Sequence, residues 1–382
     1  MAGNIVSYAE RAFDTFDERA FCPVDSLILA WFSYFHLGCA FKDAPDAALP
    51  MTRLYRSELF DEMLHDFWDA PSTRQLFAAV MASRRFRDMR ALSYVEAFDA
   101  AEEKQFAAVS FQLTDDLAYV AFRGTDSSLI GWKEDFSMAF KTPVPAQESA
   151  VHYLNAVSQR LKGRLLVGGH SKGGNLAVYA ASECDRAVQD RIERVYSHDG
   201  PGFLESVLQS ESFQRIAMRI DKTLPQSSVV GMLLEHQENY SIIRSSRVSL
   251  LQHDPFSWQV ENSAFVPFSH LTSDAVYLDH TISAWLAQLS EADRERFVDA
   301  LFDVLSANDV STMDELRMGW PKNVPAALRT LSQMNPDTKT FFSHTLRELA
   351  ALCVRNFPEL LGRPAVPAPL AGKPSGGRTD AE

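Results

Sequence analysis

The stretch RLLVGGHSKGGNLAVYAA, residues 164–181, decides the fold class of this chain. Its first half is a short apolar run that is typical of a buried β-strand. The run stops at Ser171, which lies among glycines, and a helical spacing of apolar residues begins directly after it. A strand that passes at once into a helix is the repeating unit of α/β proteins, in which a mainly parallel sheet has both faces covered.

The segments on either side continue this alternation of strand and helix. The predicted elements are a hairpin of QFAAVSFQL (105–113) and LAYVAFRGT (117–125), a helix SAVHYLNAVSQRLK (149–162), a strand and turn IERVYSHDGPGF (192–203), a helix ESVLQSESFQRIAMRI (205–220), and short strands SSVVGMLL (227–234) and YSIIRSS (240–246). The sequence therefore predicts an α/β fold, with a mainly parallel sheet that has helices on both faces.

Helical additions are expected at both ends of this central sheet. The predicted organisation is a helical region packed on the core (1–100), an α/β core (101–270), a helical C-terminal region (271–362) and a Pro/Gly/Ala-rich disordered tail (363–382). The N-terminal region includes VDSLILAWFSYFHLGCAF (24–41), RSELFDEMLHDFWD (56–69) and STRQLFAAVMASRRFRDM (72–89), which all have helical spacing of apolar residues. No clean linker separates the helical ends from the middle, so they are expected to pack on the sheet.

Composition and charge limit the kinds of molecule that this protein is expected to bind. The chain has 382 residues, 46% hydrophobic and 23% charged, which is ordinary for a globular protein with a sizeable core. Its formal net charge of −13 argues against a nucleic acid as main partner and against adsorption to anionic lipid. No apolar run approaches the roughly 20 residues of a membrane-spanning helix, so no transmembrane segment is expected. The sequence does not indicate an oligomeric state.

Targeting and cofactor signals are not found either. The N-terminus, MAGNIVSYAERAFDTFDERAF (1–21), lacks the apolar run of a secretory signal, and we expect a cytoplasmic protein. The four cysteines are scattered without a CxxC, as expected of reduced structural thiols. The ten histidines form no HExxH and no Cys/His cluster with the spacing of a zinc site, so no metal or other cofactor is expected.

Gly169-His170-Ser171-Lys172-Gly173 fits the G-x-S-x-G pattern of a nucleophile elbow. In such a turn the serine takes a strained conformation, and its neighbours must be small because the helix starts close to the strand. The N-terminus of the helix favours developing negative charge, and the amide of Lys172 would donate to an oxyanion. The alternative is a glycine turn that serves only close packing.

A second candidate element is AYVAFRGTDSSLIGWKEDF, residues 118–136. Acyl transfer needs a second oxyanion donor from a neighbouring strand end, and here Thr125 or Asp126 could supply a backbone N–H. The Thr125 hydroxyl could add another donor. The alternative is a loop in which Asp126 acts as a cap. Glu134 and Asp135 are expected to fix the loop behind this strand.

Three of these segments, FRGTD (122–126), GWKEDF (131–136) and GHSKGGNLA (169–177), resemble the class 3 (fungal-type) lipases of the α/β-hydrolase superfamily. The sequence resembles more closely a bacterial lipase-like family of unknown function, through SHDGPGF (197–203), PQSSVVGMLLEH (225–236) and QHDPFSWQV (252–260). The resemblance covers roughly residues 15–320 and is specific in 118–260. The resemblance implies an α/β-hydrolase-like fold, with the α/β-hydrolase core at 101–270, and the catalytic residues of a serine hydrolase. It implies no particular substrate.

The general base must be a histidine downstream of Ser171, because in α/β-hydrolases the chain order is serine, acid, histidine. The candidates are His198, His236, His253, His270, His280 and His344. His253 is preferred because it follows the last strand-like stretch, where the lipases place their histidine. His236 is the alternative, and a loop histidine bonded to backbone is the non-catalytic interpretation of His253.

The acid is not fixed by the resemblance. The lipases place an aspartate after a late strand, where this chain has Ser227 and Ser228. Asp199 is the first substitute because it ends the strand after the elbow helix and keeps the order; its other interpretation is a turn-forming aspartate. Asp254 is a further alternative, although its side chain is expected to diverge from that of His253.

These patterns predict a cytoplasmic serine hydrolase that acts on a small-molecule or lipid-like carboxylic ester. Ser171 would be the nucleophile, His253 the base and Asp199 the acid, with Thr125 and Lys172 at the oxyanion. One alternative is a catalytically inactive interaction module of the same fold, which the serines in the expected acid position favour. Another is a thioesterase or peptidase with the same nucleophile, because fold analogy does not fix the substrate.

Overall fold

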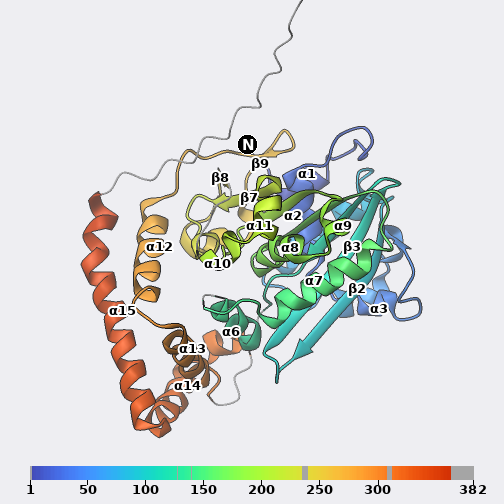
Figure 1. Ribbon diagram of the computed structural model, residues 1–382. Coiled ribbons are helices and arrows are strands. Elements are labelled where there is room, and N and C mark those ends of the chain that lie inside the picture. Colours follow the sequence, from blue (N-terminus) through green and yellow to red (C-terminus); the bar gives the residue numbers. More distant parts are fainter. Residues whose placement is uncertain (1, 127, 139, 235–239, 308–311, 363–382) are drawn as a thin grey trace, which may run out of the picture.

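The computed structural model describes residues 2–126, 128–138, 140–234, 240–307 and 312–362. Within these ranges the central feature is an eight-stranded sheet whose strands lie in the order of the sequence (Figure 1). The first four strands pair antiparallel, and the strands from the fourth to the eighth pair parallel. The strands are β1 (Leu49–Pro50), β2 (Arg90–Asp99), β3 (Lys104–Thr114), β4 (Leu117–Phe122), β5 (Arg164–His170), β6 (Ile192–His198), β7 (Ile220–Pro225) and β8 (Tyr240–Ile243).

The strand order decides which helices cover which face. Each parallel strand is added next to the previous one, and right-handed crossovers then place all the connecting helices on one face. That face carries α7 (Pro145–Ser158), α8 (Lys172–Glu183) and α11 (Glu211–Ile216). The opposite face would stay bare without the N-terminal helices α1 (Ile5–Ala9), α2 (Pro23–Phe32) and α5 (Ala70–Ala82), which cover it (Figure 1). The structure is therefore an α/β fold with helices on both sides of a mainly parallel sheet.

The central strands alternate their side chains between these two layers. In β4, Tyr119 packs into the core beneath the N-terminal helices, whereas Val120 packs beneath α7 and α8. The same alternation holds for Leu166 and Leu165 in β5. Both faces are apolar because both are buried, which is why these strands appear in the sequence as continuous apolar runs. The N-terminal region thus shares one core with the sheet.

The structure corrects several sequence-based expectations. Arg90–Asp99, inside the region expected to be helical, is strand β2, which pairs with β3 and has a register shift between Leu92 and Val95. Ile220–Pro225, of which only Ile220 was included in an expected helix, is the buried strand β7. SSVVGMLL is not a strand: a tight turn follows Pro225, and Val230–Met232 is a 3₁₀ turn. Of RSELFDEMLHDFWD, only short helical pieces form, including α4 (Phe60–Met63).

The remaining helices and strands are short connecting elements and the C-terminal helices. They are α3 (Gly38–Phe41), α6 (Leu129–Ser137), α9 (Arg186–Gln189), α10 (Glu205–Leu208), β9 (Val260–Glu261), β10 (Ala264–Phe265), α12 (Ser273–Leu286), α13 (Glu291–Leu305), α14 (Met313–Gln333) and α15 (Pro336–Gly362). None of the helices in the described ranges has both the length and the apolar character needed to cross a bilayer.

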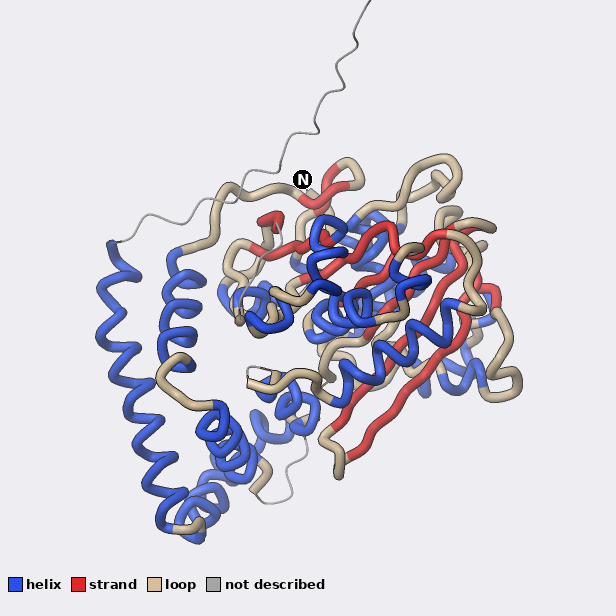
Figure 2. The backbone as a smooth tube through the Cα atoms, in the orientation of Figure 1, coloured by secondary structure: helices blue, strands red, loops and turns tan. Residues whose placement is uncertain are grey.

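The C-terminal helices stand beside the sheet rather than on it (Figures 1 and 2). They reach the core through α6: Val298 and Phe302 of α13 cluster with Leu129 at the start of α6. Lys133 of α6 also pairs with Asp299 of α13, with Nζ and Oδ1 2.8 Å apart. The region therefore contacts the helix that follows the FRGTD segment. The expected disordered tail, 363–382, lies outside the described residues.

Candidate active site

Ser171 forms a strained turn between β5 and α8. Its backbone has φ 58° and ψ −134°, a conformation that costs free energy for any residue other than glycine. The glycines around it are required by space: a Cβ on Gly173 would lie 2.2 Å from the carbonyl oxygen of Phe122. A Cβ on Gly169 would lie 2.2 Å from the carbonyl of Gly173. The local geometry is that of a nucleophile elbow.

The FRGTD segment lies directly against this elbow. A Cβ on Gly124 would lie 3.0 Å from Cβ of Ser171 and 2.6 Å from the carbonyl oxygen of His170. Lys172 is the first residue of α8, so its amide has no partner within the helix. The hydroxyl of Thr125 donates to Oδ2 of Asp135. Because that proton is committed to Asp135, the group that Thr125 can offer an oxyanion in this state is its backbone N–H.

His253 and Asp199 meet beside the elbow. Nδ1 of His253 lies 2.6 Å from Oδ2 of Asp199, and the two side chains are 27% and 1% exposed. Asp199 follows β6 directly and has a φ of 53°, which turns its side chain out of the strand direction. The amide of Ser171 donates to the carbonyl of His198, 2.9 Å away, so the acid-bearing strand end and the serine are adjacent.

A second histidine fixes the position of the His253 loop. Nε2 of His170 lies 2.9 Å from the carbonyl oxygen of His253, and the two rings have centroids 4.6 Å apart. Nδ1 of His170 lies 3.3 Å from the Tyr34 hydroxyl. Burial lowers the pKa of His170 well below its usual value, so the ring is neutral and donates through Nε2 while Nδ1 accepts. Among the described residues, Ser171 Oγ makes no hydrogen bond to the His253 ring; such contacts are often long in empty catalytic sites.

The other acid and base candidates have different partners. Asp254 pairs with Arg247 and accepts the amide of Phe256 at 3.0 Å, so it faces away from the imidazole. Asp126, the alternative oxyanion donor, accepts the amide of Ser128 at 2.7 Å, and its own amide lies 3.4 Å from Oε1 of Gln105. His236 lies outside the described residues.

The two serines at the position expected for an acid follow β7 and differ in their contacts. The hydroxyl of Ser228 donates to Oδ1 of Asp199. The hydroxyl of Ser227 instead lies 2.7 Å from that of Thr272. The carboxylate and a serine hydroxyl therefore come from adjacent strand ends, β6 and β7.

A buried charge network underlies the FRGTD segment, and sequence reasoning did not find its centre. Lys172 is fully buried, and its Nζ donates to Oε2 of Glu134 at 2.9 Å and to the carbonyl of Gln105 at 3.1 Å. The other carboxylate oxygen of Glu134 accepts the amide of Ala146 at 2.9 Å. The expectation that Glu134 fixes the loop rested on GWKEDF alone. Because the partner lysine is 38 residues away, no local signal identified it.

Asp135 adds a titratable group beside this network. Burial raises the pKa of the Asp135 carboxyl to about 6, while Lys172 and the bond from Thr125 act in the opposite direction. Asp135 therefore carries a charge that depends on pH near neutrality, one hydrogen bond away from the proposed oxyanion segment.

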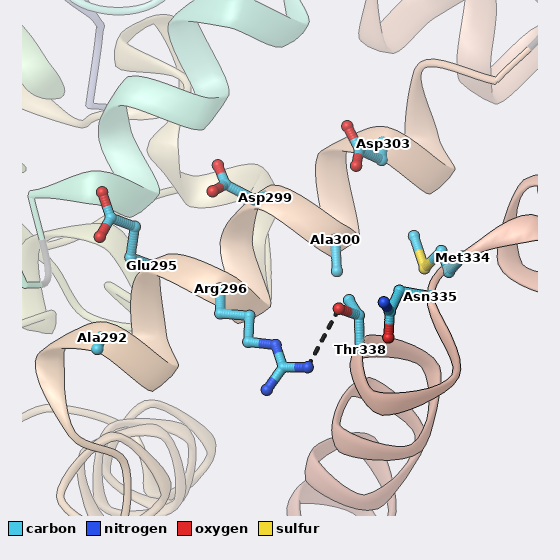
Figure 3. Close-up of a pocket in the computed structure, with 9 residues that line it drawn as sticks. All are labelled: Ala292, Glu295, Arg296, Asp299, Ala300, Asp303, Met334, Asn335 and Thr338. Atoms are coloured by element: carbon cyan, nitrogen blue, oxygen red, sulfur yellow. Dashed lines mark hydrogen bonds between the residues drawn. The ribbon is translucent and has the colours of Figure 1, made fainter.

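A hollow of about 450 Å³ lies elsewhere, between α13 and the start of α15. Its lining is mixed, with three carboxylates among nine residues, and Arg296 donates across it to the hydroxyl of Thr338 at 3.1 Å (Figure 3). Its lining residues are Ala292, Glu295, Arg296, Asp299, Ala300, Asp303, Met334, Asn335 and Thr338. These include no serine, cysteine or histidine, so the hollow does not have the chemistry of the elbow.

The fold is an α/β fold with helices on both faces of a mainly parallel sheet. The Mbeg1-like family model matches residues 80–303, which is more than half of the chain, and the chain belongs to the Mbeg1-like family. A comparison with curated proteins gives no match.

Two solved structures illustrate the low level of structural similarity. The native Rhizomucor miehei lipase propeptide complex has 16% identity and a TM-score of 0.32, over 41% of this chain and 57% of that chain. The M37 lipase crystal structure has 13% identity and a TM-score of 0.36, over 55% of this chain and 68% of that chain. The match thus spans little more than half the length of the Rhizomucor miehei chain, and neither similarity extends to function.

Proposed function

We propose that this protein is a serine hydrolase that cleaves a carboxylic ester. The observation that carries the proposal is the 2.6 Å contact between His253 Nδ1 and Asp199 Oδ2 beside the strained backbone of Ser171. A serine at a strand-to-helix turn, a histidine and a buried carboxylate are the three groups that acyl transfer needs. The three side chains come together where β5 and β6 end, and this convergence supports the proposal.

In this mechanism Oγ of Ser171 attacks the acyl carbonyl while Nε2 of His253 takes its proton. Asp199 remains ionised, accepts from Nδ1 and stabilises the imidazolium that forms. The imidazolium then gives its proton to the departing alkoxide, which leaves as an alcohol. Water repeats the sequence on the acyl-enzyme: His253 removes its proton, the hydroxide adds to the carbonyl, and the carboxylic acid leaves as Ser171 is reprotonated.

The oxyanion that forms in each step lies between two backbone segments. The amides of Lys172 and Thr125 are the proposed donors, and the N-terminus of α8 adds a favourable field. The ion pair of Lys172 with Glu134 anchors the first amide, and the bond from Thr125 to Asp135 anchors the second. Both donors are therefore fixed before substrate arrives, which is what electrostatic stabilisation of a transition state requires.

The test is labelling with a fluorophosphonate, which reacts with activated serines. The wild type is expected to be labelled, and Ser171→Ala is expected not to be. Ser182→Ala, which removes another buried hydroxyl further along α8, is the matched control and should label normally. Turnover of matched short-chain oxygen esters, thioesters and amides then separates an esterase from a thioesterase or a peptidase. A folded wild type that is neither labelled nor active on any of them would support the inactive module.

A further inference from the structure

We propose that Ser228 is a positioning residue for the proposed hydrolase: its hydroxyl holds the Asp199 carboxylate in the orientation that His253 needs. The inference rests on the proposed function and adds to it a residue that acts only through the acid. It also gives a role to the serine that stands where the lipase resemblance leads one to expect the acid itself.

The contacts of Ser228 leave its hydroxyl one orientation. The residue is 1% exposed, and its Oγ accepts the amide of Gly231 at 3.1 Å. With that side of the oxygen occupied, the single hydroxyl proton is donated to Oδ1 of Asp199. The other oxygen of the carboxylate, Oδ2, faces Nδ1 of His253. Among the described residues each carboxylate oxygen thus has one donor, and the two donors fix the rotation of the group.

The turn after β7 is shaped around this contact. A Cβ on Gly231 would lie 2.3 Å from Oδ1 of Asp199 and 2.9 Å from Oγ of Ser228, so a larger residue would push the two apart. The amide of Ser228 donates to the carbonyl of Pro225 at 2.9 Å, which closes the turn. The amide of Asp199 donates to the carbonyl of Thr223 at 2.8 Å, which ties its backbone to the same strand. Both ends of the hydrogen bond are therefore anchored on β7.

Removal of the hydroxyl has a defined chemical consequence. Asp199 is 1% exposed, so water cannot readily replace the lost donor at Oδ1. The carboxylate is then free to rotate toward another donor, and it no longer presents a fixed lone pair to Nδ1 of His253. The imidazolium that forms during the reaction is consequently less stabilised, while the binding of a substrate acyl group is unaffected.

The experiment compares Ser228→Ala with Ser227→Ala, the same change at a neighbouring buried serine whose hydroxyl contacts Thr272 instead. Steady-state turnover of a p-nitrophenyl ester is measured for each variant, alone and combined with Asp199→Asn. Ser228→Ala is expected to lower kcat about 10- to 100-fold, with KM within about twofold of the wild type, as for loss of a hydrogen bond to a charged group. Ser227→Ala should change kcat less than about threefold. Ser228→Thr should recover most of the loss because it restores the hydroxyl.

The combined variants distinguish positioning from a general structural effect. If Ser228 acts only through the acid, Ser228→Ala should cost less than about twofold once Asp199 is already Asn. Equal losses in both backgrounds, or a Ser228→Ala that matches Ser227→Ala, would overturn the proposal while the hydrolase assignment stood. Absence of fluorophosphonate labelling in the folded wild type would overturn the assignment and this inference together.

A second measurement tests the proposal if Ser228→Ala does not fold well enough for kinetics. The low-field proton resonance of the His253 Nδ1–H can be followed in the wild type, Ser228→Thr and Ser227→Ala. It should be retained at the wild-type position in Ser227→Ala and shift only slightly in Ser228→Thr, which keeps a donor with altered packing. If the resonance is lost in Ser227→Ala and retained in Ser228→Thr, Ser227 rather than Ser228 positions Asp199. That result would overturn the proposal.

Discussion

Replacing Asp199 by asparagine tests the proposed site most directly. The change keeps the volume of the side chain and removes one negative charge from a group that is 1% exposed. An amide oxygen can still accept from the Ser228 hydroxyl or from Nδ1 of His253, so the fold should survive. What the variant loses is the charge opposite the imidazolium and the preference for the tautomer with the proton on Nδ1.

The contact distance sets the size of the effect. With nitrogen and oxygen 2.6 Å apart, the two delocalised charges have centres separated by roughly 4 Å. At an effective dielectric constant of about 20, the attraction is about 4 kcal/mol, or a factor of about 10³ in rate. His253 is 27% exposed, and partial screening by water lowers this figure. We therefore expect kcat to fall by about 10² to 10³, with KM little changed.

The assay is steady-state hydrolysis of a short p-nitrophenyl ester, with thermal unfolding to check the fold. Asp254→Asn is the matched control, because it removes a charge from the adjacent residue, which pairs with Arg247 rather than with the imidazole. That control should lower kcat less than about tenfold. Turnover of Asp199→Asn within tenfold of wild type, or equal to that of Asp254→Asn, would refute Asp199 as the acid.

Two further predictions concern stability. Gly173→Ala should lower the free energy of unfolding by about 1–3 kcal/mol and reduce turnover, because its Cβ would lie 2.2 Å from the Phe122 carbonyl oxygen. Gly38→Ala is the control: its Cβ would lie 3.9 Å from the nearest atom, so the free energy of unfolding should change by less than about 1 kcal/mol. Urea titrations measure both. Asp135→Asn should be stabilising relative to wild type above pH 6 and not below pH 4, because burial raises the pKa of the carboxyl from 3.8 to about 6 and the charged form is the costly one. Urea titrations at pH 4 and pH 7.5 measure this difference, and an equal effect at both pH values would contradict it.

Features that depend on neighbouring residues were predicted well from the sequence. The strand that ends at His170, the helix that begins at Lys172 and the hairpin of β3 and β4 follow from apolar periodicity and from glycine. The positive φ of Ser171 follows as well, because a strand can join a helix within one residue only through such a conformation.

Features that depend on the sheet as a whole were predicted poorly. β2 contains polar residues on its partly exposed positions, and its strand character comes from pairing with β3 rather than from its own pattern. β7 was not predicted: the helix predicted before it ends at Ile220, the strand predicted after it begins at Ser227, and IDKTLP is short and carries charged residues. Lys172 becomes fully buried only because β3 and α6 place a carbonyl and a carboxylate around its ammonium group.

The sequence by itself determined the α/β alternation, the strained serine and the order in which an acid and a base could follow it. Only the tertiary structure decided which of the candidate acids and bases contact each other. Asp199 and His253 are 54 residues apart, and their contact depends on β6 ending beside β5 and on His170 holding the His253 loop. Ser228 reaches the same carboxylate because β7 is the next strand. Periodicity and capping are local, whereas the adjacency of strand ends is set by sheet order, which no short segment encodes.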